Sequence, residues 1–567
     1  MIEQVQRWVP GVRTVRTYQR VWLTRDLVAG VVLAAILVPQ GMAYAELAGL
    51  PAVTGLYTTI TCLIGYALFG PSKVLVLGPD SSISPMILAA ITPLLVADDP
   101  TTAVVLAGML AVMVGLIEVG LGLGRLGFVA DLLSNEVQIG YLNGLAITIV
   151  VSQLPKLFGF STDADGFFDE ISEFVSNLDA TVGAALAVGV GVLVVLLVLP
   201  RFTRRIPAVL VAVVGATVVS SLLSLSEHGV DTVGTLPQGF PTPSVPWTSF
   251  EDVGLLLLAA VGITLVSLTD TIATATAFAA RRGEEIDPNQ EMVGMGAANL
   301  AAGFFQGFAI STSTSRTAVA EQSGAKSQLT GVVGAGIVVV LLVFLNGLVA
   351  DLPQPALAAV VIAAAISLTD LATLRRYWRV RRSALLLSLT ASLGVILFGV
   401  LQGILVAIVL AVLLFFHRSW WPHGAVLAHT PGVEGWHSLE DFPDGREEPG
   451  IIVYRWEAPL FFANAGSFRR EVQRLATRPG TEWIIIQCEA ITDIDVTAAA
   501  TLESLDRELN QEGIHMAFVE MRSRLKDMAL RYGLLETLDA DHFYPSMESA
   551  LSAIRAHPAI EDNPDGV

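Results

Sequence analysis

Residues 23–57 read LTRDLVAGVVLAAILVPQGMAYAELAGLPAVTGLY and contain the apolar run 27–45 and the start of a second run, 51–70. Each run approaches the roughly 20 apolar residues that an α-helix needs to cross a bilayer. An arginine-rich stretch precedes the first run, and no small-residue cleavage site follows it. The sequence therefore predicts a pair of transmembrane helices rather than a removable signal peptide.

The composition of the chain indicates that lipid solvates much of it. Of the 567 residues, 53% are hydrophobic and 15% are charged, and the mean hydropathy is +0.64, whereas soluble globular chains carry about 25% charged residues. The formal net charge of −19 argues against a nucleic-acid partner, because phosphate binding needs clustered basic residues. The two cysteines, Cys62 and Cys488, provide neither a disulfide framework nor a zinc-ligand spacing, so we expect no metal and no cofactor.

Apolar runs of spanning length recur as far as residue 417. The stronger runs are 27–45, 51–70, 103–121, 137–156, 180–200, 207–226, 252–280, 329–349, 354–370 and 383–417, and the weaker ones are 82–97, 287–305 and 311–323. The final strong run has room for two helices with a turn near Gly399. The sequence thus predicts an all-α membrane region of 14 transmembrane segments.

The charges between these segments alternate in sign. With a cytoplasmic N-terminus, the loops after even-numbered segments should be cytoplasmic and rich in Arg and Lys. The basic residues of those loops are Lys73, Arg125, Arg201, Arg204, Arg205, Arg281, Arg282, Lys326, Arg375, Arg376, Arg379, Arg381 and Arg382. The opposite loops are acidic or neutral and include Asp98, Asp99, 160–174 and 237–247. We therefore predict a multi-pass protein of the cell (inner) membrane, in contact with lipid, with both termini in the cytoplasm.

Beyond the apolar runs the pattern changes to that of a soluble α/β domain. Strands are expected at 450–456, 483–491 and 514–521, and helices at 466–476, 497–511 and 523–537. The predicted divisions of the chain are a cytoplasmic segment 1–24, a membrane domain 25–418, a proline-containing linker 419–449, the α/β domain 450–556 and a disordered tail 557–567.

Two Ser/Thr clusters interrupt the apolar sequence. They are GPDSSIS at 78–84 and STSTSR at 311–316, and they lie roughly 230 residues apart, each before a weak apolar segment. Such a spacing fits a chain made of two halves of seven segments. Because seven is odd, the second half would be inverted, and broken helices of the two halves would meet at the midplane, as in secondary transporters.

The ends of such broken helices favour an anion. The first N–H groups of a helix lack intrahelical partners and its N-terminus carries about half a positive charge, and hydroxyl groups add donors without fixed charge. Two facing N-termini could therefore hold a small oxyanion or halide. The candidate donors are Ser81, Ser82, Thr314 and Ser315. In the alternative interpretation these hydroxyls only cap or back-bond their helices.

Three further polar residues stand in the apolar segments near these clusters. Arg316 is a cation in an apparent membrane segment, which is unfavourable unless it is paired or functional. It could help to hold the anion, or it could extend its charge to the cytoplasmic surface. Gln40, after Pro39, and Tyr44 one turn later share a helix face and could line the site.

Asp270 is a carboxylate in the middle of a predicted span. Burial disfavours its charged form, so it could take up a proton and release it as its surroundings open. With Thr271 and Thr274 it could alternatively bind Na⁺ through oxygen ligands. A structural ion pair is the third interpretation.

Most of the chain is similar to one known family. The stretch 23–57, the cluster GPDSSIS and the stretch 278–331 resemble the sulfate permease (SulP) family, with VPQGMAYA (38–45) and SRTAVAEQSGAKSQL (315–329) the most specific motifs. The likeness is to actinobacterial-type sulfate transporter homologues. The C-terminal part resembles a STAS domain.

The resemblance implies a 7+7 inverted repeat divided into core and gate domains, an elevator-type movement and a homodimer. It places the anion between the third and tenth segments, with help from the first and eighth. The positions that match the family site are Gln40, Tyr44, Ser81, Ser82, Ser315 and Arg316. The carboxylate of the eighth segment is Asp270, and Asp270 with Thr274 is similar to the pair of sodium-coupled bicarbonate members, so the coupling ion stays open between a proton and sodium.

In the STAS-like part, the stretch DIDVTAAATL resembles the phosphorylation site of anti-sigma-factor antagonists. Thr497 stands where those proteins have serine. A phosphate would suit a helix N-terminus. We expect Thr497 to be an N-terminal cap, with regulation as the alternative.

The resulting hypothesis is secondary active transport of an inorganic anion, with proton-coupled sulfate uptake favoured. The alternatives are a bicarbonate, dicarboxylate or chloride transporter or exchanger, and a non-transporting anion sensor that signals through the STAS domain. The sequence contains no nucleotide-phosphate loop, metal-ligand cluster or nucleophile–base motif, so we do not expect an enzyme.

Overall fold

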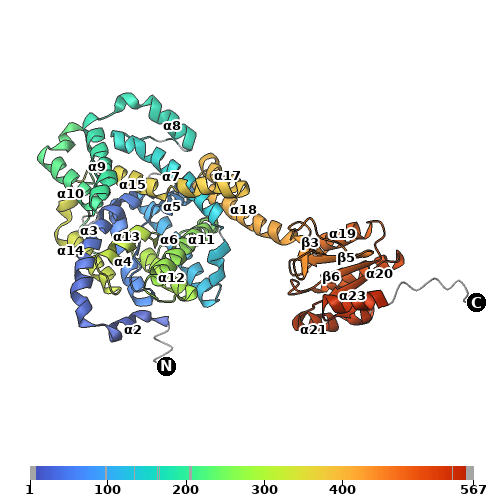
Figure 1. Cartoon of the computed structure of the whole chain (residues 1–567). Helices are drawn as coiled ribbons and strands as arrows, with labels where there is room; N and C mark the ends of the chain where they lie inside the picture. The colour runs from blue at the N-terminus through green and yellow to red at the C-terminus, as the bar shows by residue number, and fades with distance from the viewer. Residues whose placement is uncertain are drawn as a thin grey trace, which may run out of the picture. The chain divides into compact units, whose positions relative to one another are not determined.

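The computed structural model describes residues 8–95, 99–132, 134–162, 164, 166–203, 207–538 and 540–556. The chain divides into two compact units, Met1–Ala411 and Val412–Val567. The first consists of helices and the second of a sheet with helices (Figure 1). The predicted tail 557–567 and the predicted loop residues Asp98, Arg204 and Arg205 lie outside the described residues.

The first unit has a helix at every segment that the sequence assigns to a span. These helices are α3 (Leu23–Leu47), α4 (Ala52–Phe69), α5 (Ser84–Ile91), α6 (Pro100–Leu123), α7 (Asn135–Phe158), α9 (Gly183–Phe202), α10 (Ala208–Leu222), α11 (Phe250–Ala280), α12 (Pro288–Phe304), α13 (Thr314–Gln322), α14 (Leu329–Phe344), α15 (Gln354–Leu368), α17 (Arg382–Phe398) and α18 (Val400–Trp420). The predicted turn in the last run lies at Gly399, whose φ of 90° suits glycine. Three amphipathic helices accompany them: α2 (Pro10–Thr17), α8 (Phe167–Ser176) and α16 (Leu371–Val380).

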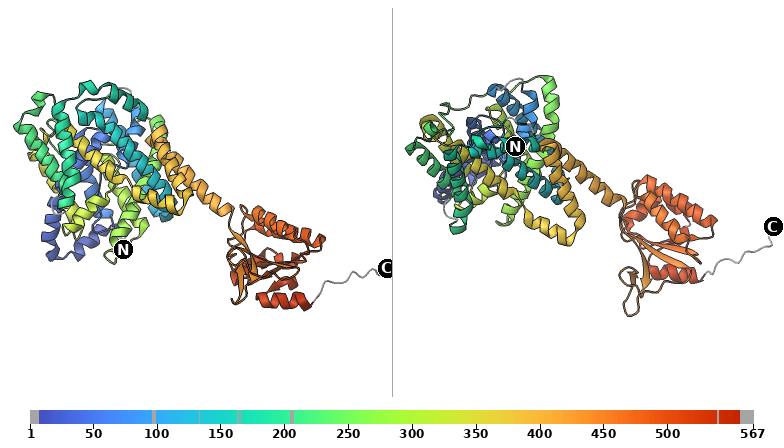
Figure 2. Two further views of the ribbon diagram at one scale, coloured as in Figure 1. Left: turned by 45° about the horizontal axis from the view of Figure 1, so that its top comes forward. Right: turned by 90° about the horizontal axis from the view of Figure 1, so that it is seen from above.

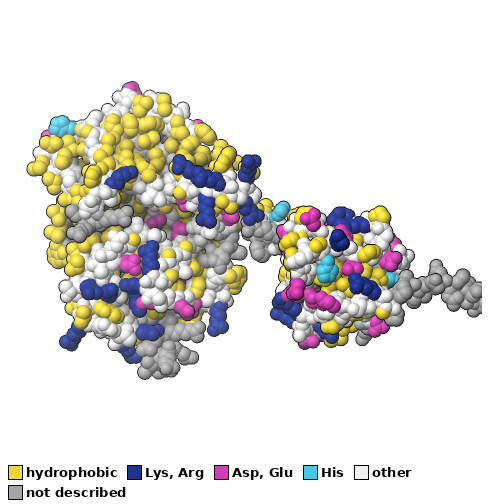
Figure 3. All heavy atoms as spheres, in the orientation of Figure 1, with side chains coloured by type: hydrophobic (Ala, Val, Ile, Leu, Met, Phe, Trp, Pro, Cys, Tyr) yellow, Lys and Arg dark blue, Asp and Glu magenta, His cyan; other side chains and the backbone are white. Residues whose placement is uncertain are grey.

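Seven helical stretches of the described chain are long and apolar enough to cross a membrane. Their outward faces carry large exposed side chains, such as Val194 on α9 and Leu257 on α11. Figure 3 shows mainly hydrophobic side chains on the part of the surface where α9 lies, with Lys and Arg side chains gathered below it. Apolar surface of this extent indicates contact with lipid.

The helices of the first unit pack as two groups. In the first group, α3, α4, α6, α11, α12 and α14 pack against one another, and the short helices α5 and α13 contact α3. In the second group, α7 contacts α9, α15 and α17, and α9 contacts α10. The groups meet where α3 packs against α10 and α15; Figure 2 shows the unit from two further sides.

Within the first group, α6 and α12 pack closely against each other along glycines. A Cβ on Gly115 of α6 would lie 2.7 Å from the carbonyl oxygen of Gly296, and one on Gly303 of α12 would lie 2.6 Å from the carbonyl oxygen of Gly108. The two backbones are therefore in direct contact. Small residues permit this approach, which is the usual means of helix association in membranes.

A buried carboxylate joins the start of α3 to the start of α14. Asp26, which is fully buried, accepts hydrogen bonds from the N–H groups of Lys326 (2.6 Å) and Ser327 (3.2 Å). It also accepts from the hydroxyls of Ser327 (2.8 Å), Thr330 (3.1 Å) and Tyr18 (3.0 Å). One side chain thus satisfies the donors that precede α14.

The second unit is built on a six-stranded sheet of order β4-β3-β5-β6-β7-β8. The strands are β3 (Gly424–His429), β4 (Trp436–Ser438), β5 (Ile451–Trp456), β6 (Trp483–Gln487), β7 (His515–Val519) and β8 (Phe543–Tyr544). β5 to β8 are parallel, and β3 and β4 pair antiparallel at one edge. The prediction of a linker over 419–449 is wrong, because β3 and β4 form within it, and its prolines lie in the connections around these strands.

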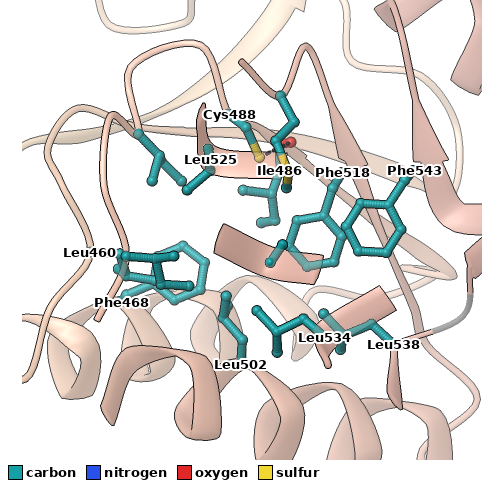
Figure 4. A pocket seen from close by; sticks show the side chains of 14 residues that line it. Leu460, Phe468, Ile486, Cys488, Leu502, Phe518, Leu525, Leu534, Leu538 and Phe543 are labelled. Atoms are coloured by element: carbon teal, nitrogen blue, oxygen red, sulfur yellow. Dashed lines mark hydrogen bonds between the residues drawn. The ribbon is translucent and has the colours of Figure 1, made fainter. Parts of the chain in front are cut away.

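Helices cover both faces of this sheet (Figure 1). They are α19 (Ala465–Ala476), α20 (Val496–Gln511), α21 (Ser523–Arg531), α22 (Leu534–Thr537) and α23 (Met547–Ala556). Side chains of α19 to α22 form the larger core with one face, and α23 packs on the other. Figure 4 shows the larger core, where Cys488, Phe518 and Leu502 surround an apolar cavity of about 20 Å³. Burial raises the pKa of the Cys488 thiol to about 12, so we expect this cysteine to be unreactive.

We predict that Asp26→Ala destabilises the protein by about 2–3 kcal/mol, because it leaves several buried donors without an acceptor. The measurement is the thermal unfolding midpoint of the detergent-solubilised protein. Asp99→Ala is the matched control, since Asp99 also accepts from Thr101 and Thr102 at a helix start but is exposed. Equal effects of the two substitutions would contradict a special role for Asp26.

Candidate functional site

Two short strands bring the two Ser/Thr clusters together. β1 (Leu77–Gly78) pairs antiparallel with β2 (Ser311–Thr312), with Leu77 opposite Thr312 and Gly78 opposite Ser311. Each strand leads into a short helix, β1 into α5 and β2 into α13. The pairing therefore places the N-terminal ends of two helices from distant parts of the sequence side by side.

A cavity of about 860 Å³ opens in front of these helix ends. Its polar wall comes from the first helix group and consists of Gln40, Tyr44, Asp80, Ser81, Ser82, Asp270, Thr274, Thr312, Ser313, Thr314 and Ser315. Its opposite wall comes from α7, α9, α10 and α15 and is mostly apolar, with Ile139, Leu142, Leu196, Val209, Val360 and Leu368. Eight of the ten residues that the sequence singles out in the membrane thus line one cavity; Thr271 and Arg316 do not.

The hydroxyls at the helix ends differ in how far they are already hydrogen-bonded. Ser82 donates to Asp80 Oδ1 through its backbone N–H (3.0 Å) and its hydroxyl (2.8 Å). Ser313 is the N-cap of α13, and its Oγ lies 3.0 Å from that of Ser315. The hydroxyl of Thr314 lies 2.8 Å from that of Thr274. Thr314 and Ser315 are the exposed members, so they present their polar atoms to the cavity.

Arg316 lies behind the cavity wall rather than in the cavity. Its side chain is 1% exposed, and its Nη1 donates to the carbonyl oxygen of Pro79 at 2.7 Å. Its Nη2 lies 3.6 Å from Asp80 Oδ2, and the absence of a side chain at Gly78 makes room for the guanidinium. Arg316 therefore neither extends to the surface nor lines the cavity; it joins α13 to the segment before α5 and compensates the charge of Asp80.

Asp270 lies on the polar wall, opposite an amide of the other helix group. Gln138 of α7 donates its Nε2–H to Asp270 Oδ1 at 2.8 Å. One turn away, the hydroxyl of Thr271 lies 2.8 Å from that of Thr312. No Lys, Arg or His in the described part of the chain forms an ion pair with Asp270, in contrast to Asp80 with its Arg316. The interpretation of Asp270 as half of a structural ion pair is therefore not supported.

Sequence reasoning missed several residues of this cavity. Asp80 stands inside the cluster GPDSSIS and could have been identified as the partner of a buried arginine. Ser313 could have been identified as an N-cap, since it directly precedes a helix. Gln138 gives no such signal, because only the packing of α7 against the cavity brings it to Asp270.

Thr497 in the second unit is not the N-terminal cap that the sequence predicts. The cap of α20 is Asp495, whose Oδ1 accepts from the N–H of Ala498 at 2.8 Å. Its Oδ2 accepts from the N–H of Phe462, also at 2.8 Å. Thr497 lies in the first turn of the helix with an exposed side chain, so its regulatory role stays a prediction.

Comparisons with known proteins agree on the kind of molecule. The model of the sulfate permease family matches residues 23–391, and that of the STAS domain matches residues 443–550. A probable sulfate transporter of Mycobacterium tuberculosis is 40% identical over 550 residues, which cover 97% of this chain and 98% of the relative. Human solute carrier family 26 member 6 is 33% identical over 81% of this chain and 63% of its own length.

Among solved structures, the chain is similar to a murine anion transporter, solute carrier 26 family member A9 in the inward-facing state. The TM-score is 0.90 at 23% identity, with 98% of this chain and 95% of that one covered. The transmembrane domain of a cyanobacterial bicarbonate transporter gives a TM-score of 0.61 at 24% identity over 69% of this chain and 97% of its own. These likenesses show that the helical unit and the sheet unit have the fold of such transporters.

The family match covers more than half of the chain and the bacterial relative covers nearly all of it. The paired helix ends and the cavity lie inside the matched region. The chain belongs to the sulfate permease family of membrane anion transporters and carries a C-terminal STAS domain.

Proposed function

We propose that the protein takes up sulfate together with protons, and that the anion binds at the adjoining N-terminal ends of α5 and α13. The observation that carries this proposal is the pairing of β1 with β2, because it directs two helix N-termini into one cavity. The bacterial relative's description as a probable sulfate transporter supports the choice of anion.

The electrostatics of the helix ends suit a small oxyanion. Each N-terminus contributes about half a positive charge and unpaired N–H groups. The exposed hydroxyls of Thr314 and Ser315 add donors at the same place. Arg316 adds a full positive charge directly behind them, with its Nη1 donating to Pro79 and its Nη2 lying 3.6 Å from Asp80 Oδ2. The anion would therefore be held by dipoles and hydroxyls, and a fixed cation would not trap it.

Proton coupling follows from the uncompensated carboxyl group in the same cavity. An ionised Asp270 would repel a bound anion, and two like charges 4 Å apart repel by roughly 4 kcal/mol at an effective dielectric constant of 20. A proton on Asp270 removes this repulsion, so the anion and the proton would bind together. Sodium fits less well, because Oδ1 faces the amide N–H of Gln138, whereas hard cations need oxygen ligands.

The two helix groups suggest how the site would move. We propose an elevator-type movement, in which the group with α3, α5, α11 and α13 carries the polar wall past the apolar wall. Hydrogen bonds between the groups are then remade, among them Gln138 with Asp270 (2.8 Å) and Gln354 Nε2 with Glu46 Oε1 (3.1 Å). The apolar wall that the first group would slide along offers few polar contacts to break.

The charge pattern orients this arrangement in the membrane. The cavity is bounded by the end of α9 and the end of α15, next to Arg201 and the arginines of α16. By the excess of basic residues, these ends lie on the cytoplasmic side. We therefore propose an inward-open arrangement in the inner membrane with cytoplasmic termini, in a homodimer as the family resemblance implies.

We predict that wild-type protein in liposomes takes up labelled sulfate faster when the outside is acidic, and that Asp270→Asn abolishes this acceleration while leaving sulfate binding in place. The reason is that the asparagine is neutral at every pH. Asp370→Asn is the matched control, since Asp370 also lines the cavity but its carboxylate caps α16 through Thr373.

The same assay separates the alternatives. If a sodium gradient rather than external acid accelerated uptake, the coupling ion would be sodium and not the proton. Stronger uptake of bicarbonate, a dicarboxylate or chloride than of sulfate would identify that anion as the substrate. Binding without uptake would favour an anion sensor, and an unchanged acid response in Asp270→Asn would remove Asp270 as the coupling residue.

We predict that Ser82→Leu and Ser315→Leu each weaken sulfate binding at least about tenfold, or 1.4 kcal/mol, because a bulky apolar side chain would fill the space at the helix ends. The measurement is the shift of the thermal unfolding midpoint with sulfate concentration. Ser367→Leu serves as control, since Ser367 lines the apolar wall and its hydroxyl is bonded to the Ala364 carbonyl oxygen. Retained affinity in both test variants would place the anion elsewhere.

A further inference from the structure

Glu118 is a buried carboxyl group to which neither the cavity nor the proposed coupling assigns a task. It lies in the C-terminal part of α6 with a side chain that is 0% exposed. Ser267 of α11 lies 3.0 Å from its Oε1, and Asn299 of α12 donates Nδ2–H to its Oε2 at 2.8 Å. Among the described residues none forms an ion pair with it, and an unpaired charge at this depth is strongly unfavourable.

The hydrogen bonds around Glu118 fit its neutral form. Ser267 has one hydroxyl proton, and its Oγ also lies 3.3 Å from the carbonyl oxygen of Thr264. A protonated Glu118 can donate to Ser267, which then donates to Thr264, while Asn299 donates to the remaining oxygen of Glu118. Every donor in this chain of contacts then has an acceptor.

The packing around Glu118 leaves little room for water. The glycines of α6 stand one turn before and one turn after it, at Gly115 and Gly122. A Cβ at Gly122 would lie 2.6 Å from the Asn289 carbonyl oxygen, and one at Gly115 would lie 2.7 Å from that of Gly296. The helices α6 and α12 therefore touch on both sides of Glu118.

Asn299 connects Glu118 to the anion site. While the Asn299 amide N–H faces Glu118, its Oδ1 accepts from the backbone N–H of Ile310 at 2.9 Å. Ile310 directly precedes β2, which leads through Ser313 into α13. Glu118 thus orients the Asn299 side-chain amide, and the amide oxygen in turn holds the Ile310 backbone that precedes β2 and the anion site.

We propose that Glu118 is a positioning residue that keeps its proton throughout the transport cycle and, through Asn299 and Ile310, holds β2 and the N-terminus of α13 in register with α5. This inference rests on the proposed anion site at α5 and α13. It leaves the transported proton to Asp270, which lines the cavity, whereas Glu118 does not.

The test compares Glu118→Gln with Glu118→Leu. Glutamine reproduces the neutral side chain, with an oxygen for Asn299 and an N–H for Ser267, so sulfate affinity, uptake and its acid response should equal those of wild type. Leucine removes the acceptor for Asn299, so sulfate affinity should fall roughly tenfold while the acid response persists. Loss of the acid response in Glu118→Gln, or unchanged affinity in Glu118→Leu, would overturn the proposal.

Two controls separate positioning from general damage to the fold. Glu291→Leu removes a different buried carboxyl group, on α12, which accepts from the Tyr66 hydroxyl, and it should leave sulfate affinity unchanged. Asn299→Leu should weaken binding as Glu118→Leu does, and the double variant should be no worse than either, because both act through one path.

An infrared measurement judges the protonation state without any transport. The wild-type minus Glu118→Gln difference spectrum should contain the C=O stretch of a protonated carboxyl group at both acidic and mildly alkaline pH. A carboxylate band in its place would overturn the proposal even if Glu118→Leu fails to fold. Absence of acid-driven sulfate uptake in wild type would refute the proposed coupling, and the binding and infrared measurements would still decide the role of Glu118.

Discussion

The structure depends on one constraint, which is that a helix too short to cross the bilayer must end inside it. At 1.5 Å per residue, a helix of eight or nine residues spans only about 12–14 Å, so α5 and α13 expose their first N–H groups at depth. Backbone polar groups need partners there. The β1–β2 pairing satisfies the strands that lead into these helices, and the helix ends that remain are free to hold a solute. Because α5 and α13 end inside the bilayer, the strands before them must pair, and the proposed site forms at the same helix ends.

Charge placement then decides what kind of solute fits. A cation inside the cavity would bind an anion too tightly for release. Arg316 instead lies behind the cavity wall, hydrogen-bonded to Pro79 and next to Asp80. In the proposed site its field supports the helix dipoles, and the anion would contact the hydroxyl and N–H groups at the helix ends. Such a site would bind an anion and release it again, which a transporter requires.

Three buried carboxyl groups of the helical unit show how surroundings assign different roles to the same chemistry. Asp26 is saturated by donors from two chain segments and so fastens α3 to α14. Glu118 has two partners in a tightly packed interface and holds a backbone segment through Asn299. Asp270 has one amide partner and borders the cavity, which supports the proposal that it is the carboxyl group of the three that exchanges a proton. What distinguishes them is access to the cavity and the number of fixed donors.

The sequence by itself determined the helical segments, the α/β character of the C-terminal unit and most of the polar wall, because apolar run length and hydroxyl clusters are local properties of the chain. It misplaced the boundary of the second unit, since β3 and β4 are strands only by virtue of pairing with β5. It also assigned the cap of α20 to Thr497 instead of Asp495 and counted Arg316 among the residues of the site, whereas Arg316 lies behind the cavity wall. Only the tertiary structure decided that Arg316 turns toward Asp80, that Gln138 faces Asp270 and that Glu118 reaches Asn299. These contacts join residues more than 100 positions apart. Their geometry is fixed by helix packing, which local sequence patterns do not reveal.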